Sequence, residues 1–254
     1  DDNVKSNQAK ALYDGLIAQG AHPKVILHQG QHIYINAFQS LDFAEMVNLW
    51  LAHHLWGLAN GADDLLPDVL VQDNRQPQTW HPADQWDGTT TTTYNLGTGR
   101  LTPHAVEATT QFFTDGHPTA TYQKWCQDPA QWQQALLADD GTFAAHFLTP
   151  PQTQPQVFQG TPVVQARVKV NADHGLLSAF LVDRGQAKRL TTSPVVIAPR
   201  SLRAGWHFGS DDLREFELAK RPTPAKVIAF GHINLQNRHS ASQVDELRPD
   251  QFVD

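Results

Sequence analysis

The chain has 254 residues and a formal net charge of −7, with 40% hydrophobic and 18% charged residues. This composition is typical of a globular protein with room for more than one domain. The negative charge argues against nucleic acid as a partner, because a phosphate backbone attracts an excess of Lys and Arg. No apolar stretch is long enough to cross a membrane, so no membrane partner is expected. The single cysteine, Cys126, permits no internal disulfide, which fits a cytoplasmic protein.

The start of the chain has the pattern of an α/β segment. The apolar periodicity predicts a helix over residues 8–20, and its apolar face consists of Ala9, Leu12, Tyr13, Leu16 and Ile17. A short run with β-branched residues predicts a buried strand over 24–28. A second helix is expected over 41–57, with Asp42 as its N-cap and Gly57 as its stop signal.

From about residue 58 the pattern changes to short strands separated by turn signals. Residues 58–67 have the composition of a linker, and one short helix is expected near 129–137. The predicted strands cover residues 68–73, 163–172, 176–183, 193–199, 212–219 and 226–236. This spacing is typical of an all-β sandwich. We therefore predict an α/β domain end over 1–60, followed by an incomplete β-sandwich domain over 61–254.

The stretch VILHQGQHIYINAFQSLDF, residues 25–43, places two histidines, His28 and His32, on either side of Gly30. A zinc-binding H-x-x-x-H pair needs a helix, so that both imidazoles project from one face. Here a glycine lies between the histidines and a strand precedes them, so no metal is expected. His53 and His54 are adjacent on a predicted helix and their side chains diverge by about 100°, so at least one is expected to face solvent and no metal is expected there either.

The order of elements suggests that His32 is a catalytic base. The alternative is that His32 is an ordinary loop histidine without a catalytic role. In α/β-hydrolases the acid follows one late strand, a helix and a last strand come next, and the histidine lies in the loop beyond them. This chain has Asp1 and Asp2, then a helix, a strand and His32. The serines lie on no G-x-S-x-G elbow, so a nucleophile would lie outside this chain.

Several stretches resemble the X-prolyl dipeptidyl aminopeptidases of lactic acid bacteria, which are α/β-hydrolase serine peptidases related to cocaine esterase-like hydrolases. They are DDNVK, LHQGQHIYINAFQSLDFAEMVNLW, LPDVLVQDNRQPQTW, GLLSAFLVDRGQAKRL and GHINLQNR. The H-x-G-x-H-I-Y and Q-S-x-D-F stretches are the specific ones. The resemblance covers most of the chain and implies the end of an α/β-hydrolase domain, followed by a jelly-roll-like C-terminal β-sandwich.

The resemblance also implies roles for two residues. The catalytic acid maps to Asp1, with Asp2 where the family usually has an aromatic residue, and the catalytic base maps to His32. The serine lies upstream of this chain, so the chain alone would be inactive. The whole protein would release X-Pro dipeptides from peptides with proline at the second position. It would need no cofactor or metal and would be a cytoplasmic homodimer, with the missing N-terminal part as the partner of this chain.

Two other readings stay open. The β-rich part and its tryptophans, Trp80 and Trp86, also fit a carbohydrate-binding module, although packing between domains is the more ordinary role for these rings. Another acyl hydrolase of the same superfamily, such as an esterase, is the second alternative. His28 is expected to brace the turn that presents His32, with Gly30 making that turn tight.

Overall fold

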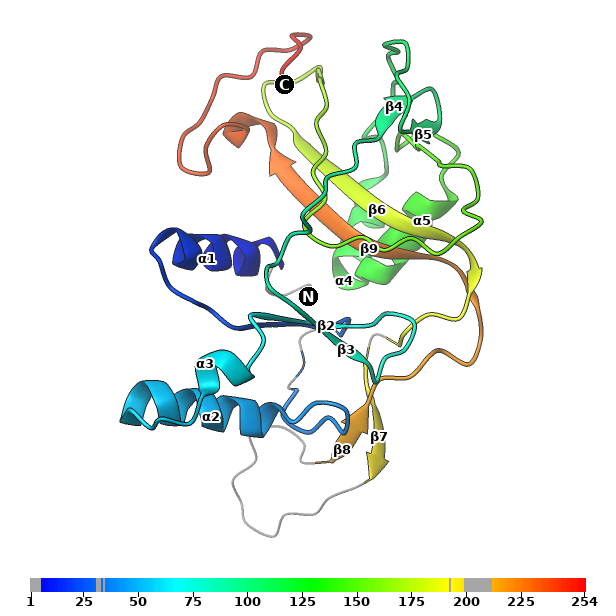
Figure 1. Ribbon diagram of the computed structural model, residues 1–254. Helices are drawn as coiled ribbons and strands as arrows, with labels where there is room; N and C mark the ends of the chain where they lie inside the picture. Colours follow the sequence, from blue (N-terminus) through cyan, green and yellow to red (C-terminus); the bar gives the residue numbers. More distant parts are fainter. Residues whose placement is uncertain (1–5, 31–32, 34, 192, 199–211) are drawn as a thin grey trace. The chain divides into compact units, whose positions relative to one another are not determined.

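The computed structural model describes residues 6–30, 33, 35–191, 193–198 and 212–254 (Figure 1). The chain forms two compact units. The first comprises Asp1–Trp86 together with Val163–Asp254, and the second comprises Asp87–Pro162. The predicted boundary at residues 60 and 61 falls inside the first unit and stays a prediction. Within the described ranges, no helix is long and apolar enough to cross a membrane.

Short elements predominate. The helices are α1 (Ser6–Ala18), α2 (Phe43–Trp56), α3 (Ala62–Leu65), α4 (Thr119–Gln127), α5 (Pro129–Ala138) and the 3-10 turn η1 (Leu235–Asn237). The strands are β1 (Val25–Leu27), β2 (Val69–Gln72), β3 (Trp80–Ala83), β4 (Asn95–Gly97), β5 (Arg100–Thr102), β6 (Leu176–Ala187), β7 (Val195–Ala198), β8 (Leu213–Glu215) and β9 (Thr223–Asn234).

A three-stranded sheet, in the order β1–β2–β3, organises the start of the first unit. β1 pairs with β2 in parallel, with Val25 opposite Val69, and β3 then pairs with β2 antiparallel. A parallel pair requires a crossover connection, which α2 and α3 supply here. A β–α–β unit therefore spans the predicted domain boundary.

The ends of α2 are set by the residues that the sequence indicates. The Asp42 carboxylate accepts a hydrogen bond from the Glu45 backbone N–H at 3.2 Å, which satisfies one of the free donors of the first turn. At the other end Gly57 adopts φ 68°, ψ 25°, and its N–H bonds the carbonyls of Ala52 and His53. Glycine tolerates this left-handed conformation without steric cost, so the helix ends there.

The remaining strands form three two-stranded sheets, β4–β5, β6–β9 and β7–β8. The longest pairing is β6–β9, which is interrupted by irregularities after Leu181 and after Arg184. The mostly β character predicted after residue 60 is confirmed. The jelly-roll arrangement and the α/β-hydrolase origin of the first segment stay predictions.

Two of the elements predicted from the sequence are wrong. The stretch 163–172 forms no strand among the described residues; it makes one isolated bridge, from Val168 to Val253. Val163 and Val164 are exposed, so no apolar face stabilises a strand there. The linker 58–67 contains α3. The helix expected near 129–137 is confirmed as α5, and α4, which the sequence did not predict, precedes it.

The irregular end of β6 is bound by the buried side chain of Arg189. Arg189 is 8% exposed and donates five hydrogen bonds. Its Nε donates to the Asp183 carboxylate at 2.8 Å, and the guanidinium nitrogens donate to the Asp183 and Gly185 carbonyls and to the carbonyl and hydroxyl of Thr223. These bonds join the end of β6 to Thr223 of β9 next to the irregularity that follows Arg184.

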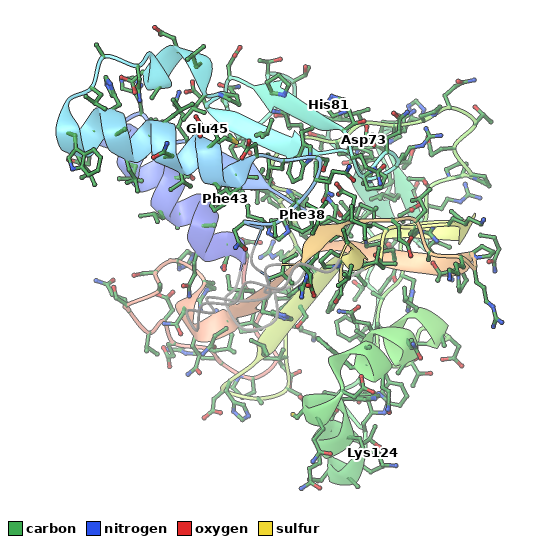
Figure 2. All side chains as sticks on the ribbon, turned by 90° about the horizontal axis from the view of Figure 1, so that it is seen from below. Phe38, Phe43, Glu45, Asp73, His81 and Lys124 are labelled. Carbon is green, nitrogen blue, oxygen red and sulfur yellow. The ribbon has the colours of Figure 1, made fainter. Side chains whose placement is uncertain are left out.

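The hydrophobic core of the first unit joins segments that are far apart in the sequence. Phe216 is fully buried and stacks on Phe38, with ring centroids 5.0 Å apart. Phe38, Leu41, Leu70, Leu190 and Phe216 form one buried cluster. From α2, Phe43 and Met46 pack against this cluster. Figure 2 labels Phe43 and Phe38.

Other apolar side chains of the two long helices are exposed. On α1, Tyr13 is buried, but Leu12 and Ile17 from the same predicted face are 65% and 47% exposed. On α2, Leu55 and Trp56 are exposed to 70% and 80%. The first unit thus leaves much of its helical apolar surface uncovered.

Candidate functional site

The predicted acid Asp1 and the predicted base His32 both lie outside the described residues. The segment that carries His32, residues 28–40, is described on either side of it, and we call this segment the histidine turn. It follows β1 directly and ends at α2. The described contacts show how both of its ends are fixed.

His28 braces the first bend of the histidine turn. Its Nδ1 accepts a hydrogen bond from the Gly30 backbone N–H at 3.1 Å. Burial lowers the pKa of His28, so the neutral imidazole, which can accept this bond, is favoured. The bracing role predicted for His28 is confirmed.

Gly30 lies in a space too small for any side chain. A Cβ atom at this position would come within 2.6 Å of Ile33 Cδ1 and 2.7 Å of Phe216 Cζ. Ordinary van der Waals contacts of such an atom begin at 3.4 Å. Gly30 does not have the positive φ that would call for glycine, so close packing is the observed reason for glycine at this position. The tight turn itself stays a prediction.

Gln72, at the end of β2, holds the entry of the histidine turn. This side chain is 2% exposed. Its Oε1 accepts from the Gln29 backbone N–H at 3.0 Å, and its Nε2 donates to the Pro77 carbonyl at 2.9 Å. A buried amide with both ends satisfied fixes the turn to the β2–β3 connection.

The β2–β3 connection itself is held by Asp73 and His81, which are labelled in Figure 2. The Asp73 carboxylate bonds His81 Nε2 at 2.9 Å and accepts from the backbone N–H groups of Arg75 and Gln76. The hydrogen bond from His81, followed by the two backbone bonds, lowers the pKa of Asp73 to about 2.

The exit of the histidine turn is fixed by a second buried polar group. Glu215, at the end of β8, is 5% exposed and accepts from the Ser40 N–H and the Phe216 N–H, both at 2.9 Å. The Trp80 indole N–H also donates to Ser40 Oγ at 3.0 Å. The segment that bears His32 is therefore fastened at both ends to three different strands, β2, β3 and β8.

The two tryptophans of the predicted aromatic turn are engaged within the first unit. Trp80 donates to Ser40 and packs against the buried cluster, and Trp86 lies 5.6 Å from the Tyr13 ring of α1. Both partners precede residue 60. Both rings pack within this unit, and their predicted role in packing between domains stays a prediction.

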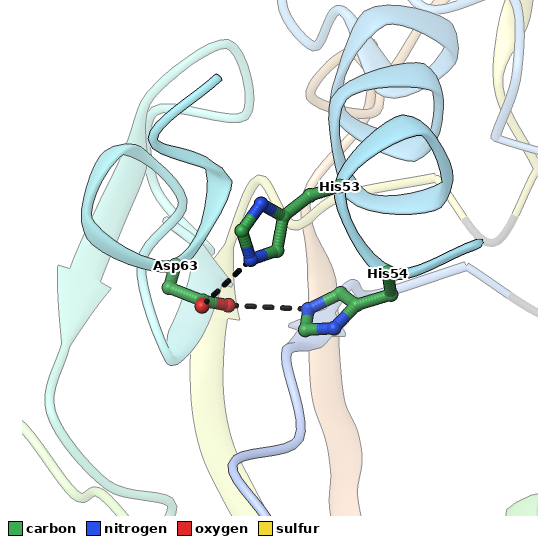
Figure 3. Close-up of side chains that lie close together, drawn as sticks. All are labelled: His53, His54 and Asp63. Atoms are coloured by element: carbon green, nitrogen blue, oxygen red, sulfur yellow. Dashed lines mark hydrogen bonds and ion pairs between the residues drawn. The ribbon is translucent and has the colours of Figure 1, made fainter. Parts of the chain in front are cut away.

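A second polar cluster was not expected from the sequence. His53 and His54, in the last turn of α2, both reach the Asp63 carboxylate of α3 (Figure 3). Their Nε2 atoms lie 3.2 Å and 3.1 Å from the two carboxylate oxygens. His54 is exposed, as expected for one of two side chains that diverge on a helix. What the sequence did not predict is the carboxylate that both imidazoles share. The sequence did contain one sign of this cluster. Gly57 and Gly61, between α2 and α3, allow the chain to turn back toward α2.

The fold and these contacts define a mostly β module that is joined to a helix–strand–turn segment. Residues 60–254 match the family model described as the X-Pro dipeptidyl-peptidase C-terminal non-catalytic domain. The chain belongs to this family. The resemblance predicted from the sequence is thereby confirmed.

Curated relatives match almost the whole chain. The Xaa-Pro dipeptidyl-peptidase of Lactiplantibacillus plantarum is 43% identical, over 99% of this chain and 32% of the relative. The proteins of the same name from Ligilactobacillus salivarius and Lactobacillus delbrueckii subsp. lactis are 40% and 32% identical, each over 99% of this chain and 32% of the relative. The chain thus spans about a third of the length of these relatives.

Proposed function

We propose that this chain is the C-terminal part of a serine exopeptidase that releases X-Pro dipeptides from the N-terminus of peptides. The observation that carries the proposal is the 43% identity to a protein named Xaa-Pro dipeptidyl-peptidase over 99% of the chain. The chain would contribute the base and the acid of a Ser–His–Asp triad, while the serine lies in the remaining part of the protein.

In this proposal His32 accepts the proton of the serine hydroxyl as it attacks the carbonyl after proline. The imidazolium then returns the proton to the leaving amine. Asp1 orients His32 through its other ring nitrogen, and the oxyanion donors lie outside this chain. Such a base must be held within a few tenths of an ångström, and the fastening of the histidine turn by Gln72 and Glu215 serves that need.

The exposed apolar side chains of α1 and α2 support a larger parent protein. Leu12, Ile17 and Leu55 are each about half exposed or more, although they belong to helices with an otherwise apolar pattern. We propose that the rest of the polypeptide covers them, since burying an aliphatic side chain of this size contributes about 1.5–3 kcal/mol. The proposal includes a homodimer in the cytoplasm, as the family resemblance implies.

The carbohydrate-binding alternative has less support. Its sequence signal was Trp80 and Trp86, and the described contacts engage both rings with Ser40 and Tyr13. The peptidase and the esterase differ in substrate alone, and the names of the relatives favour the peptidase.

A substrate comparison tests the proposal. Purified full-length protein is assayed with Gly-Pro and Ala-Pro arylamides, with Gly-Ala arylamide, and with simple aryl esters. We expect kcat/KM for the two proline arylamides to exceed the value for Gly-Ala arylamide by at least a hundredfold. A protein that hydrolyses esters but none of the arylamides would replace the proposal with the esterase, and one that hydrolyses neither would refute both enzymes.

A further inference from the structure

The His53–His54–Asp63 cluster presents three metal-ligating side chains at one point. The ligand atoms, one from each residue, all lie within 4.8 Å of one another. Both imidazoles point their Nε2 atoms at the same carboxylate (Figure 3). Surface histidine–carboxylate pairs elsewhere in the described chain, such as His81 with Asp73, bring a single imidazole to the carboxylate.

The hydrogen bond made by Nδ1 of His53 determines whether its Nε2 carries a hydrogen or a lone pair. Its Nδ1 lies 2.8 Å from the Leu58 carbonyl oxygen, which only accepts hydrogen bonds, so Nδ1 carries a hydrogen. In the neutral ring Nε2 then holds a lone pair, and this lone pair faces a carboxylate oxygen at 3.2 Å. Two acceptors in that position need a cation or a proton between them. A backbone carbonyl on the second nitrogen is also the usual arrangement around a metal-bound histidine.

The spacing fits a small tetrahedral cation. Zinc binds imidazole nitrogen and carboxylate oxygen at about 2.0–2.2 Å, which places tetrahedral ligand atoms about 3.3 Å apart. The two nitrogen–oxygen distances here are 3.2 Å and 3.1 Å. The two nitrogens face different oxygens of this carboxylate and the three ligand atoms lie within 4.8 Å of one another, so rotations of the side chains would bring them around one ion.

The surroundings carry the right charge for a cation. The cluster lies at the C-terminal end of α2, where the helix dipole is negative. The nearby Lys24 ammonium is occupied by the Asp68 carboxylate at 2.7 Å and the Asp63 carbonyl at 2.8 Å. Counting Asp63, Asp68 and Lys24, the local charge is negative as long as the imidazoles are neutral.

The site is accessible, and its ligands are ordered by packing. His54 and Asp63 line an open cavity of about 620 Å³, together with His22 and Trp50. The Trp50 ring lies 3.9 Å from the His54 ring and restricts its rotation. The side chains of His53, His54 and Asp63 are 31%, 40% and 55% exposed, so a bound ion would keep room for water as a further ligand.

We infer that His53, His54 and Asp63 form a binding site for a divalent transition-metal ion of the zinc class. The ion would join the last turn of α2 to α3, across the loop that contains Gly57 and Gly61. Its role would be to stabilise this connection between β1 and β2. The inference is independent of the peptidase proposal, since it concerns binding and stability and involves no catalytic step.

Isothermal titration calorimetry with zinc tests the inference. Full-length protein, freed of any affinity tag and treated with EDTA, is dialysed and titrated at pH 7.5. We expect saturable binding of one ion per chain at this site, weakened at least ~100-fold by His53→Ala and by Asp63→Asn, because even indirect partners of a metal ligand are worth 10–100-fold. His81→Ala, which removes a histidine from a single-imidazole pair, is the matched control and should bind like the wild type.

Thermal unfolding provides a second readout. Zinc should raise the Tm of the wild type and of His81→Ala but not that of Asp63→Asn, which keeps the size of the side chain and is expected to fold. Binding should also weaken between pH 7.5 and pH 5.5, because protons compete for the imidazoles. Absence of zinc binding by the wild type, or binding that both site variants retain, would overturn the inference.

Discussion

Replacing Gly30 with alanine tests whether close packing holds the histidine turn. The added Cβ would lie 2.7 Å from Phe216 Cζ and 2.6 Å from Ile33 Cδ1. The end of the isoleucine side chain can rotate away. The Phe216 ring cannot, because it is fully buried and stacked on Phe38 at 5.0 Å. The backbone of the turn must therefore move by several tenths of an ångström.

The cost follows from this forced movement. Overpacking of one methyl group in a well-packed site costs about 1–3 kcal/mol, so the free energy of unfolding of Gly30→Ala should fall by that amount. Gly30 lies two residues before the proposed base, and a misplacement of about 1 Å reduces catalysis about 10²-fold. A smaller displacement should therefore lower kcat for an X-Pro arylamide about 10–100-fold.

Urea denaturation and steady-state kinetics of the full-length protein measure both effects. Gly15→Ala is the matched control, since a Cβ there meets nothing within 4 Å and the residue lies inside α1. It should raise stability by about 0.5–1 kcal/mol and leave kcat unchanged. If Gly30→Ala were as stable and as active as the wild type, the packing argument for the turn would be refuted.

Substitutions at three further positions test other contacts by chemical denaturation. Gln72→Ala leaves the Gln29 N–H and the Pro77 carbonyl without their partner and should destabilise by about 1–3 kcal/mol; an unchanged midpoint would contradict this. The lowered pKa of Asp73 means that its carboxylate stabilises the fold above the ordinary carboxyl pKa of 3.8, and that this stabilisation is lost as the pH falls toward about 2. The loss in unfolding free energy caused by Asp73→Asn should therefore be smaller at pH 3 than at pH 5. An equal loss at both pH values would contradict the lowered pKa. Arg189→Ala should cost about 1–3 kcal/mol, because backbone carbonyls of β6 and β9 lose their donor. Arg189→Lys should recover only part of this, because an ammonium cannot reproduce the planar fork, and full rescue by lysine would show that charge alone matters.

Local signals in the sequence predicted the elements that depend on local interactions. The cap at Asp42, the stop at Gly57 and the strand β1 follow from short-range hydrogen bonding and backbone conformation, and each is confirmed. The strand expected over 163–172 is wrong, because β-branched residues form a strand only where a neighbour buries one of their faces. Val163 and Val164 are exposed and have no such neighbour.

The residues that hold the histidine turn in place could not be predicted from the sequence. Gln72, Glu215 and Phe216 contact the turn from positions 43 or more residues away, and no periodicity marks them. The contact of Asp63 with both His53 and His54 could not be predicted for a related reason. Two adjacent histidines diverge on an isolated helix, and they share a partner here because the chain turns back through α3.

The central claim is that His32 is the base for a serine in another part of the protein. Its most direct test is kcat for an X-Pro arylamide, measured on full-length His32→Ala with His28→Ala for comparison. We expect His32→Ala to lose at least ~10⁴-fold in kcat at unchanged unfolding free energy. His28→Ala should lose stability and a much smaller part of its turnover. A His32→Ala protein that keeps wild-type turnover would contradict the account.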